Sequence, residues 1–214
     1  MTHIVIFAKA PQPGSVKTRL IPALGAEGAA SLALRLLAHT VKQALAANVG
    51  MVELCMSPAP TDPDWHGVAI PGAVQRTAQG EGDLGARMAC AARRVTQDTE
   101  SVDKSVLLIG TDCPALTASG LKQAAQQLEQ HDAVLIPAHD GGYVLLGLKS
   151  PCPELFDQMP WSTSSVATKT LQRMAALGLR VWQGLSLHDI DEPADLKHVP
   201  DFSPEPYQLQ KTKT

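Results

Sequence analysis

The sequence lacks the features that mark several large classes of protein. Its 214 residues carry a net charge of −3, which is not the basic excess with which nucleic-acid binders neutralise phosphates. No repeat or linker divides the chain, and no basic N-terminal region leads into a long apolar stretch. No run approaches the roughly 18 apolar residues that span a bilayer. We therefore expect a cytoplasmic protein that binds neither nucleic acid nor membrane.

Cysteine is sparse as well. The four cysteines are scattered, with no C-x-x-C pair and no histidines clustered at the spacing of a zinc site. This distribution favours a reduced protein and agrees with a cytoplasmic location.

Apolar residues, by contrast, are abundant enough to form a large core. They make up 44% of the chain, which argues against disorder, and 214 residues suit one α/β domain. Short, uninterrupted apolar runs are typical of strands buried on both faces of a sheet. Between these runs lie segments whose apolar residues recur with the period of a helix. Expected strands cover residues 4–8, 51–56, a short stretch near 74, 105–110, 133–137 and 143–148, and expected helices cover 29–45, 84–97, 117–130, 166–174 and a short segment from 193. We expect a single domain over residues 1–214, with a frayed tail over 200–214.

This order of elements indicates where a ligand would bind. Strands that alternate with helices predict right-handed βαβ units and a mainly parallel sheet. The Gly-Gly pair in Asp140-Gly141-Gly142 predicts a hairpin, which adds an antiparallel strand. Ligands of such sheets bind beyond the carboxyl ends of the strands. The loop after the first strand, Asp112 and Asp140 are all expected at that edge.

The loop in FAKAPQPGSVKTRL, residues 7–20, is the first candidate site. It leaves the first strand and leads into a helix, so backbone N–H groups, the Lys17 ammonium and the Arg19 guanidinium would converge. A diphosphate or triphosphate requires such a cluster of donors. The alternative is an exposed basic turn, because lysine and arginine in polar turns are usually solvated. The loop alone leaves both possibilities open.

Asp112, in LLIGTDCP, is the second candidate. A carboxylate that directly follows a buried strand suits a Mg²⁺ ion that bridges phosphates, although an aspartate there could also cap the turn. The segment DIDEP offers a second oxygen ligand in Asp189 or Asp191. We choose Asp191 and expect Asp189 to be structural. The alternative for both is capping of the helix that begins at Pro193.

Asp140 and the segment around Trp161 are weaker candidates. Asp140-Gly141-Gly142 could be only a hairpin turn, or its glycines could let a substrate approach while Asp140 faces the acceptor or the metal. Trp161, with Ser162 and Thr163, could line an acceptor pocket or could simply staple and cap the next helix. The sequence does not separate these alternatives.

The glycines of GEGDLG match the G-x-G-x-x-G pattern of dinucleotide-binding folds. Such a motif must follow a strand, and the preceding residues, QRTAQ, are polar. We therefore do not interpret Gly80, Gly82 and Gly85 as a dinucleotide fingerprint, although Asp103 lies near the distance expected of a ribose-binding acid. Asp83 in the same stretch is expected to cap the helix that follows.

Six ordered motifs together resemble a bacterial family. FAKAPQPGSVKTRL, GEGDLGARM, IGTDCPAL, DGGYVLLGL, WSTSSV and DIDEPADL are similar to those of glycosyltransferase A-like, or nucleotide-diphospho-sugar transferase-like, proteins over Ile4 to about Leu196. The chain also resembles the guanylyltransferases of molybdenum-cofactor and phospholactate metabolism. The resemblance implies a Rossmann-like three-layer α/β/α sandwich with a mixed, mainly parallel sheet. It also implies nucleotide binding by the first loop (Ala8, Lys9, Ala10, Gly14, Lys17, Thr18 and Arg19), by Gly82, Asp83 and Leu84, and by the metal-binding Asp112.

One departure separates two possible reactions. Glycosyltransferases of this fold commonly carry Asp-x-Asp at the strand end, whereas Pro114 occupies the third position here, as in nucleotidyltransferases with a single acid. We expect a transferase that uses Mg²⁺ or Mn²⁺, a nucleotide-sugar or nucleotide donor and a small-molecule acceptor, with Lys17, Arg19, Asp112 and Asp140 as catalytic residues. A protein that binds nucleotides without turnover is the third hypothesis.

Overall fold

The computed structural model describes residues 1–97 and 105–200. Its strands are β1 (Thr2–Lys9), β2 (Val52–Ser57), β3 (Val74–Ala78), β4 (Ser105–Ile109), β5 (Ala133–Pro137), β6 (Tyr143–Leu148) and β7 (Val181–Gln183). Its α-helices are α1 (Ile21–Ala47), α2 (Leu84–Thr96), α3 (Ala118–Gln130) and α4 (Val166–Ala176), and its 3₁₀-helices are η1 (Thr18–Leu20), η2 (Pro63–Trp65), η3 (Pro153–Leu155) and η4 (Pro193–His198). Except for Pro200, the expected frayed tail lies outside the described residues, and so does Asp103.

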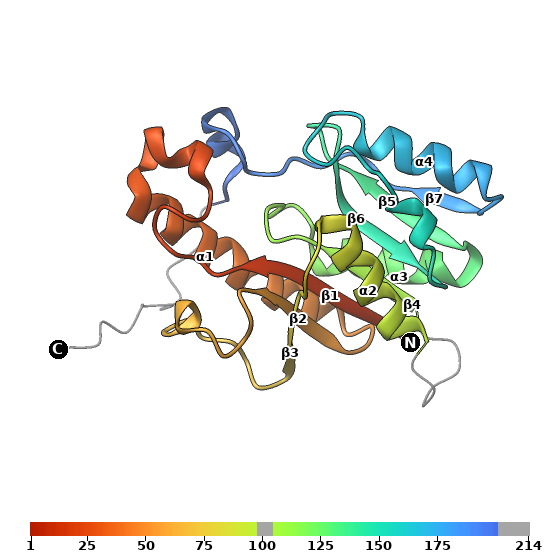
Figure 1. Cartoon of the computed structure of the whole chain (residues 1–214), viewed down its shortest axis with the longest axis horizontal. Coiled ribbons are helices and arrows are strands. Elements are labelled where there is room, and N and C mark those ends of the chain that lie inside the picture. The colour runs from red at the N-terminus through yellow and green to blue at the C-terminus, as the bar shows by residue number, and fades with distance from the viewer. Residues whose placement is uncertain (98–104, 201–214) are drawn as a thin grey trace.

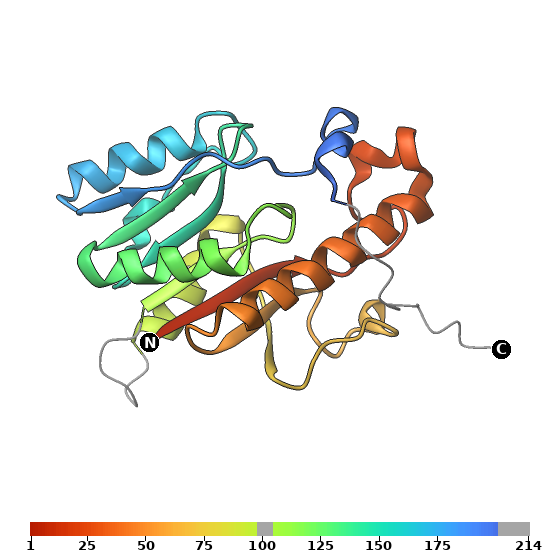
Figure 2. The ribbon, with the colours of Figure 1, turned by 180° about the vertical axis from the view of Figure 1, so that it is seen from behind.

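The strands form one mixed sheet in the order β3-β2-β1-β4-β6-β5-β7. Strand β6 runs antiparallel to both of its neighbours, and the other neighbouring pairs are parallel. Helices α1 and α3 cover one face, and α2 and α4 cover the other (Figures 1 and 2). This arrangement confirms the expected three-layer sandwich with a mainly parallel sheet and a late hairpin.

The two helical layers explain why the central strands read as unbroken apolar runs. Successive side chains of a strand point to opposite faces. Ile4 and Ile6 of β1 pack beneath α1 and α3, while Val5 packs beneath α2 and α4. All three side chains are fully buried. A strand covered on both sides needs apolar residues at every position, and the alternation of a half-exposed strand is absent.

Helix α1 begins earlier than its apolar period predicts. The expected helix starts near Ala29, but the structure places its first turn at Ile21, with a break at Gly25 (φ 71°). The early turns lie beside the chain around Ile190, and Leu20, Leu32 and Ile190 share a small separate core. A contact with the far end of the chain therefore stabilises this extension, and local sequence gives no signal of it.

Residues 18–47 are long and apolar enough, by length and composition alone, to cross a membrane. The sequence-based expectation that no segment approaches this length was therefore too strict. The core helix of a folded domain passes the same test, and ten side chains of α1 are buried in the fold. The short edge strand β7 was not expected either, because its residues are only partly buried and carry little apolar signal.

Candidate functional site

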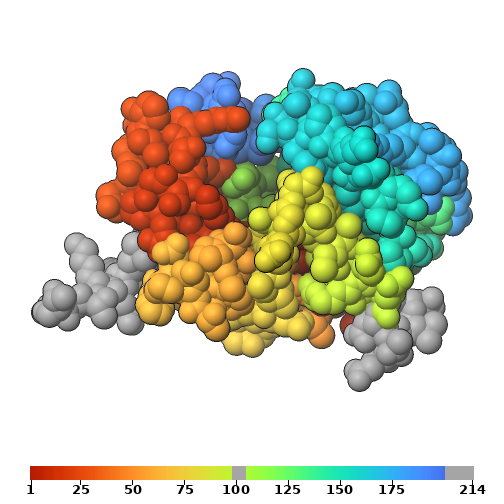
Figure 3. All heavy atoms as spheres, in the orientation of Figure 1, coloured from red at the N-terminus to blue at the C-terminus, as the bar shows by residue number. Residues whose placement is uncertain are grey.

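The carboxyl ends of β1 and β4 form the centre of the candidate site. The two strands are parallel neighbours with Ile6 opposite Ile109, so the loops that follow them leave from the same edge of the sheet. Because β6 is antiparallel, its first residue, Tyr143, lies at this edge as well. Figure 3 shows the surface hollowed here, between the red N-terminal residues and the cyan residues near α4.

The first loop (residues 10–19) has a fixed shape. The Lys9 ammonium donates to the Ser15 carbonyl at 2.8 Å, which closes the loop, and Gly14 has a positive φ of 79°. The side chains of Ala8 and Ala10 are buried, so only their backbone could face a ligand. Lys9 therefore shapes the loop, and Lys17 and Arg19 are its remaining cations.

Lys17 joins three segments that lie far apart in the sequence. Its side chain is only 6% exposed, and its ammonium lies 2.7 Å from Asp112 Oδ1. The same ammonium donates to the carbonyl of Ile190, 173 positions away. The Ile190 N–H in turn donates to the Asp112 carbonyl at 2.8 Å. The first loop, the end of β4 and the late acidic segment (residues 189–192) thus meet at one ammonium.

Arg19 lies at the open side of the same site. Its guanidinium contacts Asp191 Oδ2 at 2.5 Å, and the two side chains are 60% and 42% exposed. Ion pairs this exposed contribute little to stability because water and salt screen them. Arg19 can therefore leave Asp191 for an incoming phosphate at small cost.

Four carboxylates lie near one another at this edge: Asp112, Asp140, Asp189 and Asp191. Burial raises the pKa of Asp189, and the nearby carboxylates of Asp140, Asp112 and Asp191 add to that rise. Lys17 and the Thr111 hydroxyl both contact Oδ1 of Asp112, which leaves Oδ2 for another partner. An excess of carboxylates at a hollow edge is an environment that attracts cations.

The donor set fits Mg²⁺ or Mn²⁺, which take oxygen ligands. Within residues 1–97 and 105–200, no three carboxylate, histidine or cysteine side chains lie close enough to enclose a metal ion. Protein sites for Mg²⁺ usually supply only one or two carboxylates and leave the other positions to water and phosphate. The residues here therefore suit an ion that arrives with a nucleotide.

Asp140 occupies a rigid hairpin between β5 and β6. Its Oδ1 accepts from the Gly142 N–H at 2.7 Å, so the turn expected from the sequence is present. Gly141 (φ 93°) packs so closely that a Cβ there would lie 2.1 Å from the Ser164 carbonyl oxygen. Its own carbonyl accepts from the Ala167 N–H at 2.9 Å. The hairpin is thereby locked to the segment that contains Trp161, and a catalytic role for Asp140 stays a prediction.

The GEGDLG stretch opens α2. Asp83 caps the helix, as expected, with Oδ1 accepting from the Ala86 N–H at 2.8 Å. The reason for rejecting the G-x-G-x-x-G pattern was wrong, because β3 ends at Ala78 and the glycines do follow a strand. That strand is polar because it lies at the edge of the sheet. Nucleotide contacts by Gly82, Asp83 and Leu84 stay predictions.

Two polar residues beside this stretch, Gln79 and Arg87, were not predicted from the sequence. The Gln79 amide donates to the carbonyls of Ala8 and Cys55, both at 3.0 Å, and so ties the ends of β1 and β2 together. The Arg87 guanidinium donates to the Gln79 side-chain oxygen at 3.2 Å, and its Nε is buried without a partner among the described residues. The only signal in the sequence is their position, just before the first glycine of the pattern and just after the last.

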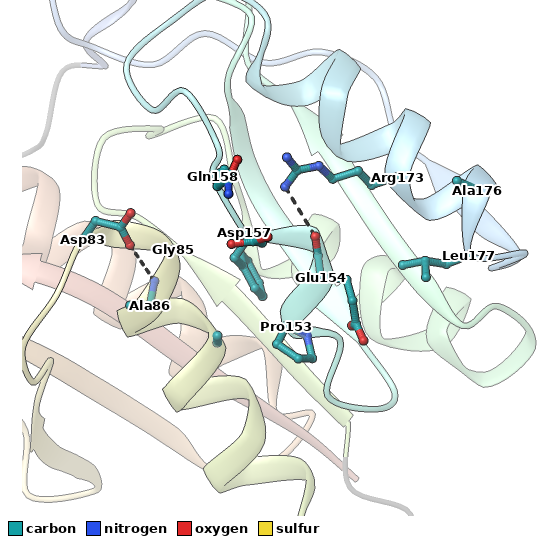
Figure 4. A pocket seen from close by; sticks show the side chains of 12 residues that line it. Asp83, Gly85, Ala86, Pro153, Glu154, Asp157, Gln158, Arg173, Ala176 and Leu177 are labelled. Atoms are coloured by element: carbon teal, nitrogen blue, oxygen red, sulfur yellow. Dashed lines mark hydrogen bonds between the residues drawn. The ribbon is translucent and has the colours of Figure 1, made fainter.

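A separate hollow of about 730 Å³ lies between α2 and α4 (Figure 4). Asp83 lies at its rim, but Lys17, Arg19, Asp112 and Asp140 are not part of it. Its cation, Arg173, already donates to the carbonyls of Glu154 and Leu155. This hollow therefore does not carry the chemistry described above.

Comparison with known proteins agrees with this fold. The sequence profile of a bacterial family described as "Uncharacterized protein conserved in bacteria (DUF2064)" matches residues 40–163. No curated protein matches the sequence. A Desulfovibrio desulfuricans G20 protein, provisionally named a nucleotide-diphospho-sugar transferase, is 31% identical; the match covers 89% of this chain and 82% of that one, with a TM-score of 0.81.

Two more distant structures share the fold alone. A nucleotidyl transferase from Methanothermobacter is 19% identical, with a TM-score of 0.58. The CMP:2-keto-3-deoxy-manno-octonic acid synthetase, solved with CTP, is 14% identical, with a TM-score of 0.54. Each match covers 92% of this chain and 95% of the other. The chain therefore has the nucleotide-diphospho-sugar transferase fold and belongs to the bacterial DUF2064 family.

Proposed function

We propose that the protein is a metal-dependent transferase that takes a nucleotide-sugar donor and passes the sugar to a small-molecule acceptor. One observation carries this proposal: the buried Lys17 ammonium joins the first loop, Asp112 and the late acidic segment at the carboxyl edge of the sheet. The 31% identical relative, itself named for nucleotide-diphospho-sugar transfer, supports the same class of reaction. The more distant neighbours include nucleotide-utilising transferases.

The two cations of the first loop would hold the diphosphate of the donor. An ammonium has three N–H donors, and Lys17 uses two of them on Asp112 and Ile190, so one remains for a phosphate oxygen. Arg19 would exchange Asp191 for phosphate oxygens in a bidentate contact. As the bond to the diphosphate breaks, both cations stabilise the negative charge on the leaving group.

Asp112 and one aspartate of the late acidic segment would hold Mg²⁺ or Mn²⁺. The sequence favoured Asp191 as the second ligand, but Asp191 is the acid that Arg19 contacts, whereas Asp189 is partly buried and close enough to Asp140, Asp112 and Asp191 for their carboxylates to add to the rise of its pKa. We therefore propose Asp189 as the second ligand. A bound divalent ion supplies positive charge to the departing diphosphate.

Asp140 would act as the base toward the acceptor. In the transfer, the acceptor oxygen bonds to the anomeric carbon of the sugar, the bond to the nucleoside diphosphate breaks, and the acceptor proton passes to Asp140. A free carboxylate oxygen supports this role, because the hairpin hydrogen bond uses Oδ1. Asp140 also lines a pocket next to this edge.

Nucleotidyl transfer is the second candidate, and the single acid at the end of β4 favours it. Asp112 is followed by Cys113 and Pro114, so this strand end carries one carboxylate. In that reaction a phosphorylated acceptor attacks the α-phosphorus, and Lys17 and Arg19 hold the departing pyrophosphate. The acceptor brings its own negative charge, so Asp140 has no proton to remove.

Calorimetric titration with ATP, GTP, CTP, UTP and their diphospho-sugars, each with Mg²⁺, Mn²⁺ or chelator, tests the proposal. We expect metal-dependent binding of a diphospho-sugar that is tighter than binding of the triphosphate with the same base. Tighter binding of a triphosphate would instead support nucleotidyl transfer. Absence of binding by every compound would overturn both reactions.

Product analysis separates the reactions from simple binding. Release of a nucleoside diphosphate in the presence of an acceptor supports sugar transfer, and release of pyrophosphate supports nucleotidyl transfer. Binding with neither product, across a panel of hydroxyl and phosphorylated acceptors, would identify a nucleotide-binding protein without turnover.

A further inference from the structure

A small pocket lies beside the phosphate-facing edge, between the start of α2, the end of β4, the start of β6 and the segment that precedes α4. Its volume is about 220 Å³. Most of its wall is apolar or aromatic and comes from Phe7, Leu84, Met88, Val144, Trp161 and Val166. Asp140 and Gly110 also line it, so the pocket reaches the edge that carries the proposed chemistry.

Two residues that line the pocket carry polar groups without ordinary partners. The Trp161 indole N–H is buried and meets no acceptor within the described parts of the chain. Among the residues that the structure describes, the Tyr143 hydroxyl has one partner, the Met88 sulfur, at 3.9 Å. Burial raises the pKa of Tyr143 well above its usual value, so the hydroxyl stays neutral and can donate. Buried donors without acceptors are costly, and a ligand oxygen would satisfy them.

The same wall disfavours charged ligands and sugars. Among the described residues, no lysine, arginine or histidine lines the pocket, and Asp140 would repel an anionic group. A sugar carries a hydroxyl on nearly every carbon, and the few polar side chains of the wall, Asp140, Ser162 and Thr163 among them, cannot pair with all of these hydroxyls. An apolar cavity of about 150 Å³ accommodates benzene, so 220 Å³ suits a ligand of about one ring with a short substituent.

The pocket is built into the fold and does not need to form on binding. Gly85 lets the Trp161 ring approach α2, because a Cβ at that position would lie 2.9 Å from the ring. Ser162, the next residue, has a left-handed backbone with φ 63°, a strained conformation for a residue other than glycine. Strain of this kind persists where surrounding contacts hold a segment in place.

We propose that this pocket binds the acceptor, and that the acceptor is an uncharged, mainly apolar alcohol about one ring in size. Its oxygen accepts a hydrogen bond from the Trp161 indole or the Tyr143 hydroxyl, and its reactive hydroxyl lies toward Asp140. The catalytic meaning rests on the proposed function, whereas the binding preference rests on the pocket alone.

Indole NMR signals test the binding preference without any nucleotide. The chain has three tryptophans, and Trp161→Phe identifies the Trp161 signal by its loss. Benzyl alcohol and cyclohexanol are expected to shift that signal saturably at millimolar concentration, while glucose and benzoate leave it unchanged. The proposal is overturned if none of these probes shifts the signal, or if glucose or benzoate shifts it as strongly as the neutral alcohols.

Variants separate the hydrogen bond from apolar contact and from unfolding. Trp161→Phe should weaken the binding of benzyl alcohol several-fold. The affinity for toluene, which has no oxygen, should stay nearly unchanged. The Met88 methyl NMR signal reports the binding of both probes. Leu84→Trp at the pocket rim should block both probes. Leu177→Trp is the matched control, because Leu84 and Leu177 are both 44% exposed and Leu177 does not line the pocket. Equal losses in the two tryptophan variants would contradict the assigned site.

The outcomes also separate the two proposals. Binding of neutral alcohols without nucleotide binding in calorimetry would overturn the proposed function and leave the pocket assignment intact. Metal-dependent nucleotide binding without any alcohol-induced shift of the Trp161 signal would overturn the pocket assignment and leave the proposed function intact.

Discussion

Lys17 and Asp112 form a mixed ion pair, with one partner buried and the other half exposed. The Lys17 side chain is 6% exposed and that of Asp112 is 51% exposed. Water therefore screens the carboxylate, and stability alone gives little reason for an aspartate here. Its position beside the first loop and the late acidic segment gives a better one, because a ligand can reach it.

Asp112→Asn keeps the shape of this side chain and removes its charge. We expect metal-dependent nucleotide affinity to fall at least 10-fold, since one of the two proposed ion ligands is lost. Titration with and without chelator measures the effect. The control is Asp132→Asn, because Asp132 also lies in an ion pair, with Arg180 at 3.0 Å, but at the start of β5 on the opposite edge. Unchanged metal-dependent affinity in Asp112→Asn would remove this residue from the site.

Asp189 and Asp191 are two positions apart and have different surroundings. Because we propose Asp189 as the second ion ligand, Asp189→Asn should reduce metal-dependent affinity more than Asp191→Asn, by roughly 10-fold. Asp191→Asn should mainly change the salt dependence of binding, because it releases the exposed Arg19. Parallel titrations at low and high salt compare the variants. A larger loss in Asp191→Asn would restore the choice made from the sequence.

At the scale of elements, a buried cluster around Glu53 links β1, β2, β3 and α2 away from the site. Glu53 is fully buried; its Oε2 accepts from Arg94 at 2.8 Å and lies 3.3 Å from His3 Nε2, and its Oε1 accepts from Thr77 at 2.5 Å. Burial alone would raise the pKa of Glu53, but the contacts with His3, Arg94 and Thr77 outweigh it and lower the pKa from 4.5 to about 2.

This shift predicts how stability depends on acid. Because folding lowers the pKa, the stabilisation is complete above pH 4.5 and disappears as the pH falls toward 2. It amounts to about 3 kcal/mol of unfolding free energy at neutral pH. At pH 7 the free energy of unfolding of Glu53→Gln should be lower than that of the unsubstituted protein by at least this amount. The difference between the two proteins should shrink as the pH falls toward 2. Denaturant titrations across this range measure the difference, with exposed Glu129→Gln as the control. A difference independent of pH would contradict the assigned cluster.

The hairpin at Asp140 depends on Gly141 in a way that its sequence does not reveal. Gly141→Ala should destabilise the protein by about 3 kcal/mol or more, because the new Cβ would meet the Ser164 carbonyl oxygen. Gly178→Ala is the control: it also has a positive φ, of 69°, but a Cβ there meets nothing within 4 Å, so about 1 kcal/mol is expected. Chemical denaturation of both variants tests this, and equal losses would show that the hairpin is not locked.

Across the whole molecule, the candidate site brings together segments that lie far apart in the chain. The first loop, the end of β4 and the late acidic segment come from the beginning, middle and end of the chain. A nucleotide that contacts all three would cross-link the fold. We expect saturation at about 100 times the dissociation constant to add about 2.7 kcal/mol. For a chain of this size that corresponds to a rise in Tm of roughly 5–10 °C.

Thermal unfolding with each nucleotide, with metal or with chelator, tests this expectation. Chelator should abolish most of the rise if nucleotide binding depends on an ion that Asp112 would help to hold. Leu177→Trp should retain the whole effect, since Leu177 is remote from the first loop. An equal rise in the presence of chelator would separate nucleotide binding from the metal.

The layers of the fold, and the sheet edge at which the candidate site lies, were predictable from the sequence. Buried strands have unbroken apolar runs, and the turns that follow them have glycine, proline and aspartate, so β1, β4 and the hairpin before β6 were predictable. Asp83 was also predictable as a cap, because capping depends on a residue and its next few neighbours.

Which side chains meet was not predictable from the sequence, because it depends on tertiary contacts. Lys17 reaches the Ile190 carbonyl across 173 positions, and the early turns of α1 form against the same segment. The aromatic wall at Trp161 depends on the close approach that Gly85 permits from another helix. Local sequence preferences do not predict such contacts, because the contacts form only when the packed sheet brings distant loops to one edge.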